Sequence, residues 1–207
     1  MKLPLITVLL WIVFTTTLRG QNKPTSIYFN AIVGVKQNKF TRQFGYDINP
    51  QVFSSSIGAG STLSKNNYLV GLEFLYSAGT RNTAIETQQY VGFSNTLFVG
   101  YNILANSRSW RLEPTVGVTL EDNQLILQTK DNRRFANYSN SHVGINLGTS
   151  VRKIMPNGLF FSLKGGYLVS LDGDTKWLNK ASGQDTGLVD NMNGYYVQLR
   201  IGGLLRL

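Results

Sequence analysis

The residues with the clearest chemical potential surround His142, the single histidine of the 207-residue chain. Serines and an asparagine precede it at positions 139–141, and Glu121 and Asp122 lie upstream. A histidine held between a hydroxyl and a carboxylate can serve as the base of a hydrolytic or acyl-transfer site, if all three groups lie within hydrogen-bond reach. The alternative interpretation is that this lone histidine is an ordinary polar residue in a hydrated part of the fold. We favour that alternative and expect no enzyme active site.

Two other short motifs suggest chemistry that their contexts do not support. Residues 172–175 read Asp-Gly-Asp-Thr, as a calcium loop can begin, but the downstream ligands of such a loop are missing. Residues 58–60 read Gly-Ala-Gly inside an expected strand, which argues against a nucleotide loop. The chain also has no cysteine, so disulfides, thiolate metal sites and thiol nucleophiles are excluded. We expect neither a metal nor a cofactor.

The charge balance is basic but dispersed. The formal net charge is +9, with 20 lysines and arginines spread over expected loops and strand interiors. Nucleic-acid binding requires a clustered basic patch, so we expect no nucleic-acid partner. An anionic membrane surface suits the exposed basic residues better.

The first twenty residues have the pattern of a secretory signal peptide. Lys2 precedes an apolar run at residues 3–14, and Gly20 supplies a small residue before the expected cleavage. The run is shorter than the ~20 apolar residues of a membrane-spanning helix. We therefore divide the chain into a signal peptide, residues 1–20, and one domain, residues 21–207.

The domain is dominated by alternating apolar and polar residues, the period of a β-strand. In the last fourteen residues, 194–207, one face carries tyrosine, valine, leucine and isoleucine, and the other carries Arg200 and Arg206. The same alternation predicts eight strands, at residues 26–36, 52–63, 68–77, 89–103, 110–120, 141–154, 159–171 and 194–207.

The connections between these strands alternate long and short. Turn residues occupy the short connections, such as Asn66-Asn67 and residues 155–158. An even number of strands, with short turns at one end and long loops at the other, is typical of bacterial outer-membrane barrels. The predicted fold is an all-β, eight-stranded antiparallel up-and-down transmembrane β-barrel that follows a cleaved signal peptide.

The inner face of this barrel is predicted to hold most strand glycines and nearly all strand charges. A charge facing lipid at the bilayer midplane costs roughly 2–4 kcal/mol, whereas a water-soluble barrel would place its charges outside. Eight strands enclose only packed side chains, so the charges must be paired. The predicted lumen charge network contains Glu73, Arg111, Glu113, Arg152, Lys164, Arg200 and Arg206. We expect it to form a structural plug; a gated narrow pore is the alternative.

The sequence resembles the small eight-stranded outer-membrane barrels of the OmpA/OmpX type, and within them the PorT-like outer membrane protein β-barrel group. The resemblance lies in YLVGLEFLYSAG at residues 68–79, VGINLGTSVRKIMPNGLFFSLKGGYLVSL at residues 143–171, and the final strand. That strand also resembles the C-terminal insertion signal of such proteins. The matching positions are Arg200, Gly202, Leu205 and Leu207, with Leu207 standing where an aromatic residue is usual.

The resemblance implies a monomeric barrel in the bacterial outer membrane, in contact with lipid, lipopolysaccharide and the barrel-assembly machinery. It implies a structural, adhesion or secretion-accessory role, with secretion or envelope proteins as partners. A narrow solute pore is the alternative, and an outer-leaflet lipid-modifying enzyme centred on His142 is the third. Residues 121–140 are expected to continue two strands beyond the bilayer and turn near residues 131–132. Their exposed edge could pair with another chain, or their basic tip could contact lipid phosphates.

Overall fold

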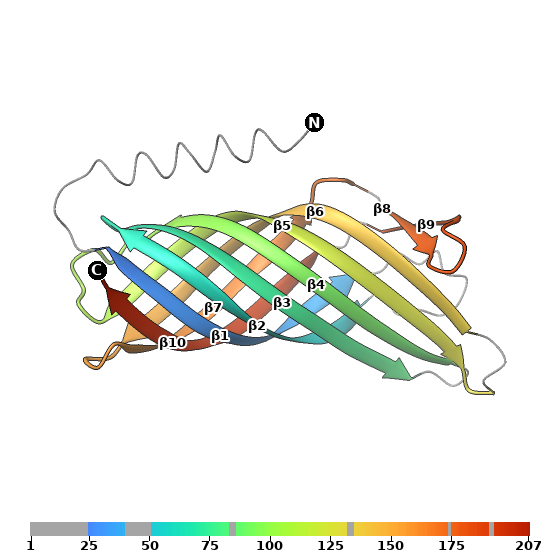
Figure 1. Cartoon of the computed structure of the whole chain (residues 1–207), viewed down its shortest axis with the longest axis horizontal. Coiled ribbons are helices and arrows are strands. Elements are labelled where there is room, and N and C mark those ends of the chain that lie inside the picture. The colour runs from blue at the N-terminus through green and yellow to red at the C-terminus, as the bar shows by residue number, and fades with distance from the viewer. Residues whose placement is uncertain (1–24, 40–50, 83–85, 132–134, 174, 191–192) are drawn as a thin grey trace.

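The computed structural model describes residues 25–39, 51–82, 86–131, 135–173, 175–190 and 193–207 as a closed antiparallel barrel (Figure 1). The expected signal peptide, residues 1–20, lies outside the described residues. The strands within these residues are β1 (Ser26–Lys39), β2 (Gln51–Lys65), β3 (Tyr68–Asn82), β4 (Glu86–Tyr101), β5 (Trp110–Thr129), β6 (Phe135–Ile154), β7 (Leu159–Ser170), β8 (Thr175–Asn179), β9 (Asp185–Asp190) and β10 (Gly194–Arg206).

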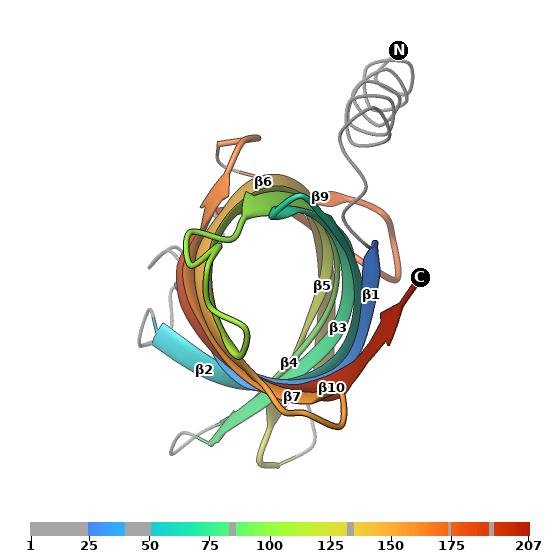
Figure 2. The ribbon, with the colours of Figure 1, turned by 90° about the vertical axis from the view of Figure 1, so that its left-hand side faces the viewer.

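The barrel wall consists of β1 to β7 and β10, each paired antiparallel with its neighbours. Pairing of β5 with β6 closes the ring, which Figure 2 shows along the barrel axis. The short strands β8 and β9 form a hairpin beside the ring, joined to it through β6. The predicted eight-stranded up-and-down barrel is therefore confirmed. No helix among the described residues is long and apolar enough to cross a membrane.

The two ends of the barrel differ in their connections. At one end, here called the turn end, Asn66 and Asn67 adopt φ values of 52° and 71°, and Gly158 has φ 85°. Such left-handed positions are tolerated by asparagine and glycine, so tight turns form there as predicted. The opposite end, here called the loop end, carries β8 and β9, which lie at the right of Figure 1.

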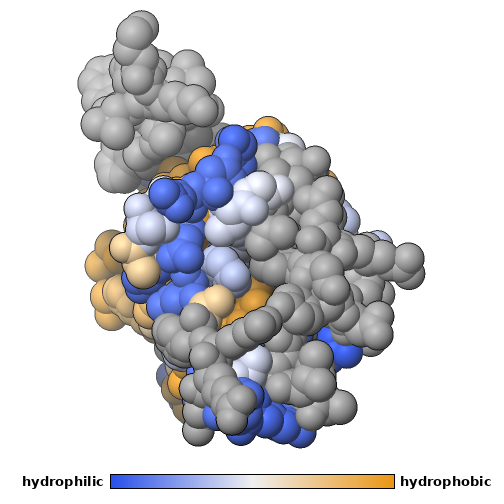
Figure 3. Space-filling model, turned by 90° about the vertical axis from the view of Figure 1, so that its right-hand side faces the viewer, coloured by the Kyte–Doolittle hydropathy of each residue, from blue (hydrophilic) through white to orange (hydrophobic). Residues whose placement is uncertain are grey.

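Apolar side chains cover the outside of the barrel. Phe29, Phe74 and Leu163 are each 56% exposed, and every wall strand carries exposed apolar side chains of this kind. Figure 3 views the loop end, where hydrophilic side chains gather at the rim and apolar ones lie at the barrel's side. An apolar exterior around a charged interior is the arrangement that a bilayer requires.

Aromatic pairs mark two levels on this exterior. Tyr68 and Tyr101 meet near the turn end with ring centroids 5.2 Å apart, and Tyr76 and Phe93 meet nearer the loop end at 5.1 Å. Eight residues of tilted strand separate Tyr68 from Tyr76, which corresponds to about 20 Å along the barrel axis. The spacing fits the two aromatic girdles that flank the apolar band of outer-membrane barrels.

The loop-end elements are more ordered than the sequence pattern predicted. As expected, both strands extend into residues 121–140: β5 reaches Thr129 and β6 begins at Phe135, and each has 20 residues. The expected loop at 79–88 is largely strand, because β3 reaches Asn82 and β4 begins at Glu86. The expected loop at 172–193 contains β8 and β9, which the sequence reasoning missed.

Candidate functional site: the barrel lumen

A buried ion cluster lies in the turn-end half of the lumen. Glu73 on β3 accepts hydrogen bonds from Lys164 Nζ at 3.0 and 3.3 Å, and its Oε1 lies 2.8 Å from Arg200 Nη2. Lys164 and Arg200 come from the neighbouring strands β7 and β10, and Glu73 comes from β3, which is separated from β10 by β1 and β2. All three are at most 2% exposed. Buried charges are stable only when paired, so this cluster ties the barrel walls together across the lumen.

A second pair lies nearby on neighbouring strands. Arg152 Nη2 on β6 is 3.0 Å from Glu113 Oε2 on β5, and Ser150 Oγ donates to the same oxygen at 3.0 Å. The Arg152 guanidinium packs on two aromatic rings, 4.2 Å from the centroid of Tyr28 and 4.8 Å from that of Phe160. Such stacking adds a cation–π attraction that strengthens when water is excluded.

The two remaining residues of the predicted network differ in their placement. Arg111 on β5 is half-buried, with its guanidinium 5.7 Å from the Tyr28 ring. Arg206 is exposed, so its predicted place inside the lumen is wrong. The pairing of β10 with β7 ends at Gly203, whereas its pairing with β1 continues to Arg206. Beyond Gly203 the inner face is therefore no longer enclosed by both neighbours, and alternation ceases to predict burial.

Glycines make room for the large interior rings, as predicted. A Cβ at Gly166 or Gly148 would meet the Tyr196 hydroxyl, and one at Gly202 would come within 2.7 Å of the Phe160 ring. The Tyr196 hydroxyl in turn donates to Asn146 Oδ1 at 2.6 Å. The lumen is thus packed with side chains rather than left open, as expected for eight strands.

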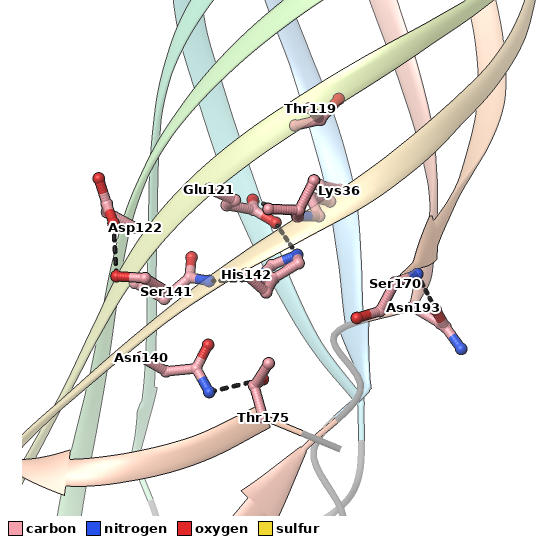
Figure 4. Close-up of polar contacts among 12 residues, drawn as sticks. Lys36, Thr119, Glu121, Asp122, Asn140, Ser141, His142, Ser170, Thr175 and Asn193 are labelled. Atoms are coloured by element: carbon pink, nitrogen blue, oxygen red, sulfur yellow. Dashed lines mark hydrogen bonds and ion pairs between the residues drawn. The ribbon is translucent and has the colours of Figure 1, made fainter. Parts of the chain in front are cut away.

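A different polar cluster occupies the loop-end half of the lumen (Figure 4). Glu121 Oε2 lies 3.0 Å from His142 Nε2, and Glu121 Oε1 is paired with Lys36 Nζ from β1. Glu121 and His142 face each other directly across β5 and β6. Sequence reasoning identified Glu121 as a possible partner of His142 but left Lys36 out. The alternation of β1, which turns Tyr28 and Asn30 inward, was the signal that could have found it.

The serines beside His142 do not join this cluster. Ser141 projects outward and donates its hydroxyl to Asp122 Oδ1 at 2.6 Å, on the face opposite His142. Ser139 shares that outward face by alternation. Asn140 turns inward and donates to Thr175 Oγ1 at 2.8 Å. A serine–histidine–carboxylate site of the kind considered from the sequence is therefore not assembled by these residues.

An apolar cluster, here called the apolar cap, lies at the loop-end rim of the barrel. Trp177 of β8 is fully buried against Tyr90, Leu125 and Leu127, which belong to β4 and β5. Alternation in β8 turns Trp177 toward the barrel and leaves its neighbours Lys176 and Leu178 exposed. The cap thus fastens the β8–β9 hairpin over the rim of the barrel.

A small polar cavity separates the two ion clusters. It measures about 30 Å³, and its lining includes Glu73 and Tyr196 on one side and Lys36 and Glu121 on the other. A volume of this size holds roughly one or two water molecules. Charged side chains of both ion clusters therefore line this cavity.

Asp172 and Gly173 of the motif at residues 172–175 follow the end of β7, and Thr175 begins β8. Asp172 Oδ2 accepts a hydrogen bond from the Val143 backbone N–H at 2.7 Å, which gives this carboxylate a local structural role. Asp174 lies outside the described residues. In the part of the chain that the structure describes, no three histidine, aspartate or glutamate side chains are grouped so that they could hold a metal ion.

The architecture and the charged lumen define the class: this is the fold of the small outer-membrane β-barrels. No sequence-family model and no curated protein sequence matches the chain. Among solved structures, it is similar to Ail, the attachment invasion locus protein of Yersinia pestis. The identity is 11%, over 88% of this chain and 100% of that one, with a TM-score of 0.55. The same protein in complex with the heparin analogue sucrose octasulfate gives a TM-score of 0.54 at 11% identity, over the same shares of the two chains.

The outer membrane protein OprG from Pseudomonas aeruginosa is similar to the same degree. It shows 13% identity over 90% of this chain and 98% of that one, with a TM-score of 0.55. These likenesses extend over nearly the whole of each known barrel, and at such low identity they are likenesses of fold.

Proposed function

We propose that this protein is an outer-membrane barrel with a structural, adhesion or secretion-accessory role, and that it does not conduct solutes. One observation carries the proposal: buried side chains fill the lumen, with the Glu73 ion cluster in its turn-end half and the Glu121 ion cluster in its loop-end half. Opening a path would require breaking buried ion pairs, each of which costs several kcal/mol once a partner is lost.

The proposed location is the bacterial outer membrane, reached through the signal peptide at residues 1–20. The apolar exterior and the two aromatic levels support contact with lipid and lipopolysaccharide. We further propose that the barrel-assembly machinery reads Arg200, Gly202, Leu205 and Leu207, and that the chain belongs to the PorT-like group. The monomeric ring has no free wall edge, because β1 pairs with β10 and β5 with β6.

The proposed contact surface is the loop-end projection formed by the far halves of β5 and β6 together with β8 and β9. The structure of Ail with a heparin analogue shows that a barrel of this fold can bind a sulfated sugar. Here Lys130, Lys176 and Lys180 are exposed on the projection. Two occupants remain open: a protein strand that pairs with the hairpin edge, or lipid phosphates held by the basic groups.

The test is the mass of the particle extracted from native membranes in mild detergent, followed by conductance of the purified barrel. We expect no solute flux into liposomes. A particle of one barrel with its micelle indicates a stand-alone envelope protein, whereas a larger one indicates a secretion or envelope assembly whose co-purifying chains name the partner. Steady single-channel conductance would contradict the proposal.

The polar cavity of about 30 Å³ supports one competing function, a narrow pore gated by the ion clusters. In that case Glu73→Ala and Arg200→Ala would change the single-channel conductance. Conductance that is present but unchanged in both variants would exclude the gate.

A further inference from the structure

Two arginines lie directly opposite each other on the inner face of the barrel. Arg111 of β5 and Arg152 of β6 are cross-strand partners. Like charges in this position repel, because the Cβ atoms of directly opposed residues are only about 4.5–5.5 Å apart. Both guanidiniums also converge on the Tyr28 ring, at 5.7 and 4.2 Å from its centroid.

The carboxylates nearby do not balance this charge. Among the described residues, the turn-end half of the lumen holds Arg111, Arg152, Lys164 and Arg200, opposed by Glu73 and Glu113. Glu73 is already paired with both Lys164 and Arg200, and Glu113 is paired with Arg152. Two positive charges are left over in a region of low dielectric constant, where uncompensated charge is most costly.

In the part of the barrel that the structure describes, Arg111 and Arg152 also have hydrogen-bond donors that lack an acceptor. Within the described residues, Nε of Arg111 and both Nε and Nη1 of Arg152 are buried and have no hydrogen-bond partner. The Tyr28 hydroxyl is likewise buried and unpartnered. Arg152 as a whole is 2% exposed, so bulk water does not reach these groups freely. Buried charged donors without acceptors are rare in proteins, because each costs a substantial desolvation penalty.

We propose that the turn-end half of the lumen binds a small inorganic anion, of the chloride or phosphate class, between the guanidinium groups of Arg111 and Arg152. The anion relieves the cross-strand repulsion, accepts hydrogen bonds from the spare donors and offsets the excess charge. Arginine forks suit this chemistry, since they present several N–H groups in one plane. Half-buried Arg111 gives the site its entrance from the turn end.

The experiment uses the mature chain folded in detergent micelles and unfolded with urea in sodium gluconate, sodium chloride or sodium phosphate. Ionic strength is held constant, so general screening is equal in the three series. A ligand that binds only the folded state stabilises it by mass action. We therefore expect the urea midpoint to rise by about 0.5 M or more when chloride or phosphate replaces the bulky gluconate. Equal midpoints in all three salts would overturn the proposal.

Arg111→Gln is the decisive variant, because it removes one of the opposed charges. It should lose the dependence on the anion, and in gluconate it should be more stable than the wild type. Arg206→Gln is the matched control, since it removes an exposed arginine at the same end and should keep the wild-type dependence. If Arg111→Gln does not fold, Arg111→Lys preserves the charge and should retain the chloride effect with a weaker phosphate effect. Retention of the full dependence in Arg111→Gln would contradict the site.

Discussion

The two halves of the lumen are closed by different means. In the turn-end half, charged side chains fill the space, and cations outnumber carboxylates. In the loop-end half, Glu121 is shared by Lys36 and His142, and an apolar cluster around Trp177 lies at the rim. Both ion clusters link distant walls of the barrel, but the apolar cluster of the loop-end half depends on the β8–β9 hairpin, which pairs with β6 through Tyr138 and Ser139. The turn-end cluster should therefore govern global stability, and the hairpin should govern local opening.

The largest effect is expected for Glu73→Ala. Its loss leaves Lys164 and Arg200 buried without their carboxylate, which should cost about 3–5 kcal/mol of the free energy of unfolding. Urea unfolding in micelles measures it. Asp122→Ala, at an exposed position, is the control and should remain within about 0.5 kcal/mol of the wild type. If Glu121→Ala lowered the free energy of unfolding more than Glu73→Ala, the loop-end half of the lumen, rather than the turn-end half, would govern global stability.

The next effect separates local from global stability. Trp177→Ala removes the largest side chain of the apolar cap, and truncations of this kind cost about 3–5 kcal/mol in a core. We expect this loss to appear as faster hydrogen exchange in β8 and β9, with the urea midpoint of the barrel nearly unchanged. Leu178→Ala, on the exposed face of the same strand, should leave the exchange as it is. A large fall in the barrel midpoint would show that the cap is part of the global fold.

A smaller effect is expected for His142→Ala. Glu121 loses one partner but keeps Lys36, so the cost should be about 1–2 kcal/mol. The variant should fold and should be less destabilised than Glu73→Ala in the same urea series. If His142→Ala destabilised the barrel as much as Glu73→Ala, the loop-end ion cluster would contribute as much to global stability as the turn-end ion cluster.

The smallest effect concerns the exposed pair of Lys176 and Asp185 in the β8–β9 hairpin. The hydrogen bond from Lys176 lowers the pKa of Asp185 below 3.8, and the same bond raises the pKa of Lys176 above 10.5. The stabilisation from Asp185 is present above pH 3.8 and is lost as pH falls below it; that from Lys176 is lost as pH rises above 10.5. Hairpin exchange, corrected for its intrinsic rate, should therefore be constant between about pH 5 and 9. A transition inside that window would implicate another group.

Alternation predicted the wall well because lipid penalises every residue that faces the wrong way. That constraint placed Glu73, Lys164 and Arg200 on one face before any contact was known. This constraint no longer applies beyond Gly203, where β10 is not paired on both sides, which explains why Arg206 was wrongly predicted to lie inside the lumen. It is also absent beyond the bilayer, where five- and six-residue strands such as β8 and β9 carry too few alternations to be recognised.

The site was predictable as a set of residues but not as a set of pairs. The alternation of inward and outward residues along each strand indicates which charged side chains face the lumen. Which of these side chains form ion pairs depends on the tilt of the strands and on their register around the ring. Glu73 illustrates this, since its partners come from β7 and β10 rather than from the adjacent β2 or β4. Glu121 and His142 were identified together because they lie on strands joined by a single hairpin.

The first and last strands of the barrel wall, β1 and β10, pair with each other, and this pairing has a consequence for the topology. The two strands are matched over eleven residue pairs, and the Leu207 N–H donates to the Thr25 carbonyl at 2.9 Å. The hydrogen-bonded ring thus runs past the break in the covalent chain without interruption. A circular permutant that joins these neighbouring positions by a short linker, with new termini opened at the loop end, would keep every wall ladder. The order of the strands along the chain is therefore set by the covalent connections alone, because the hydrogen-bonded ring is continuous and does not distinguish one strand as the first.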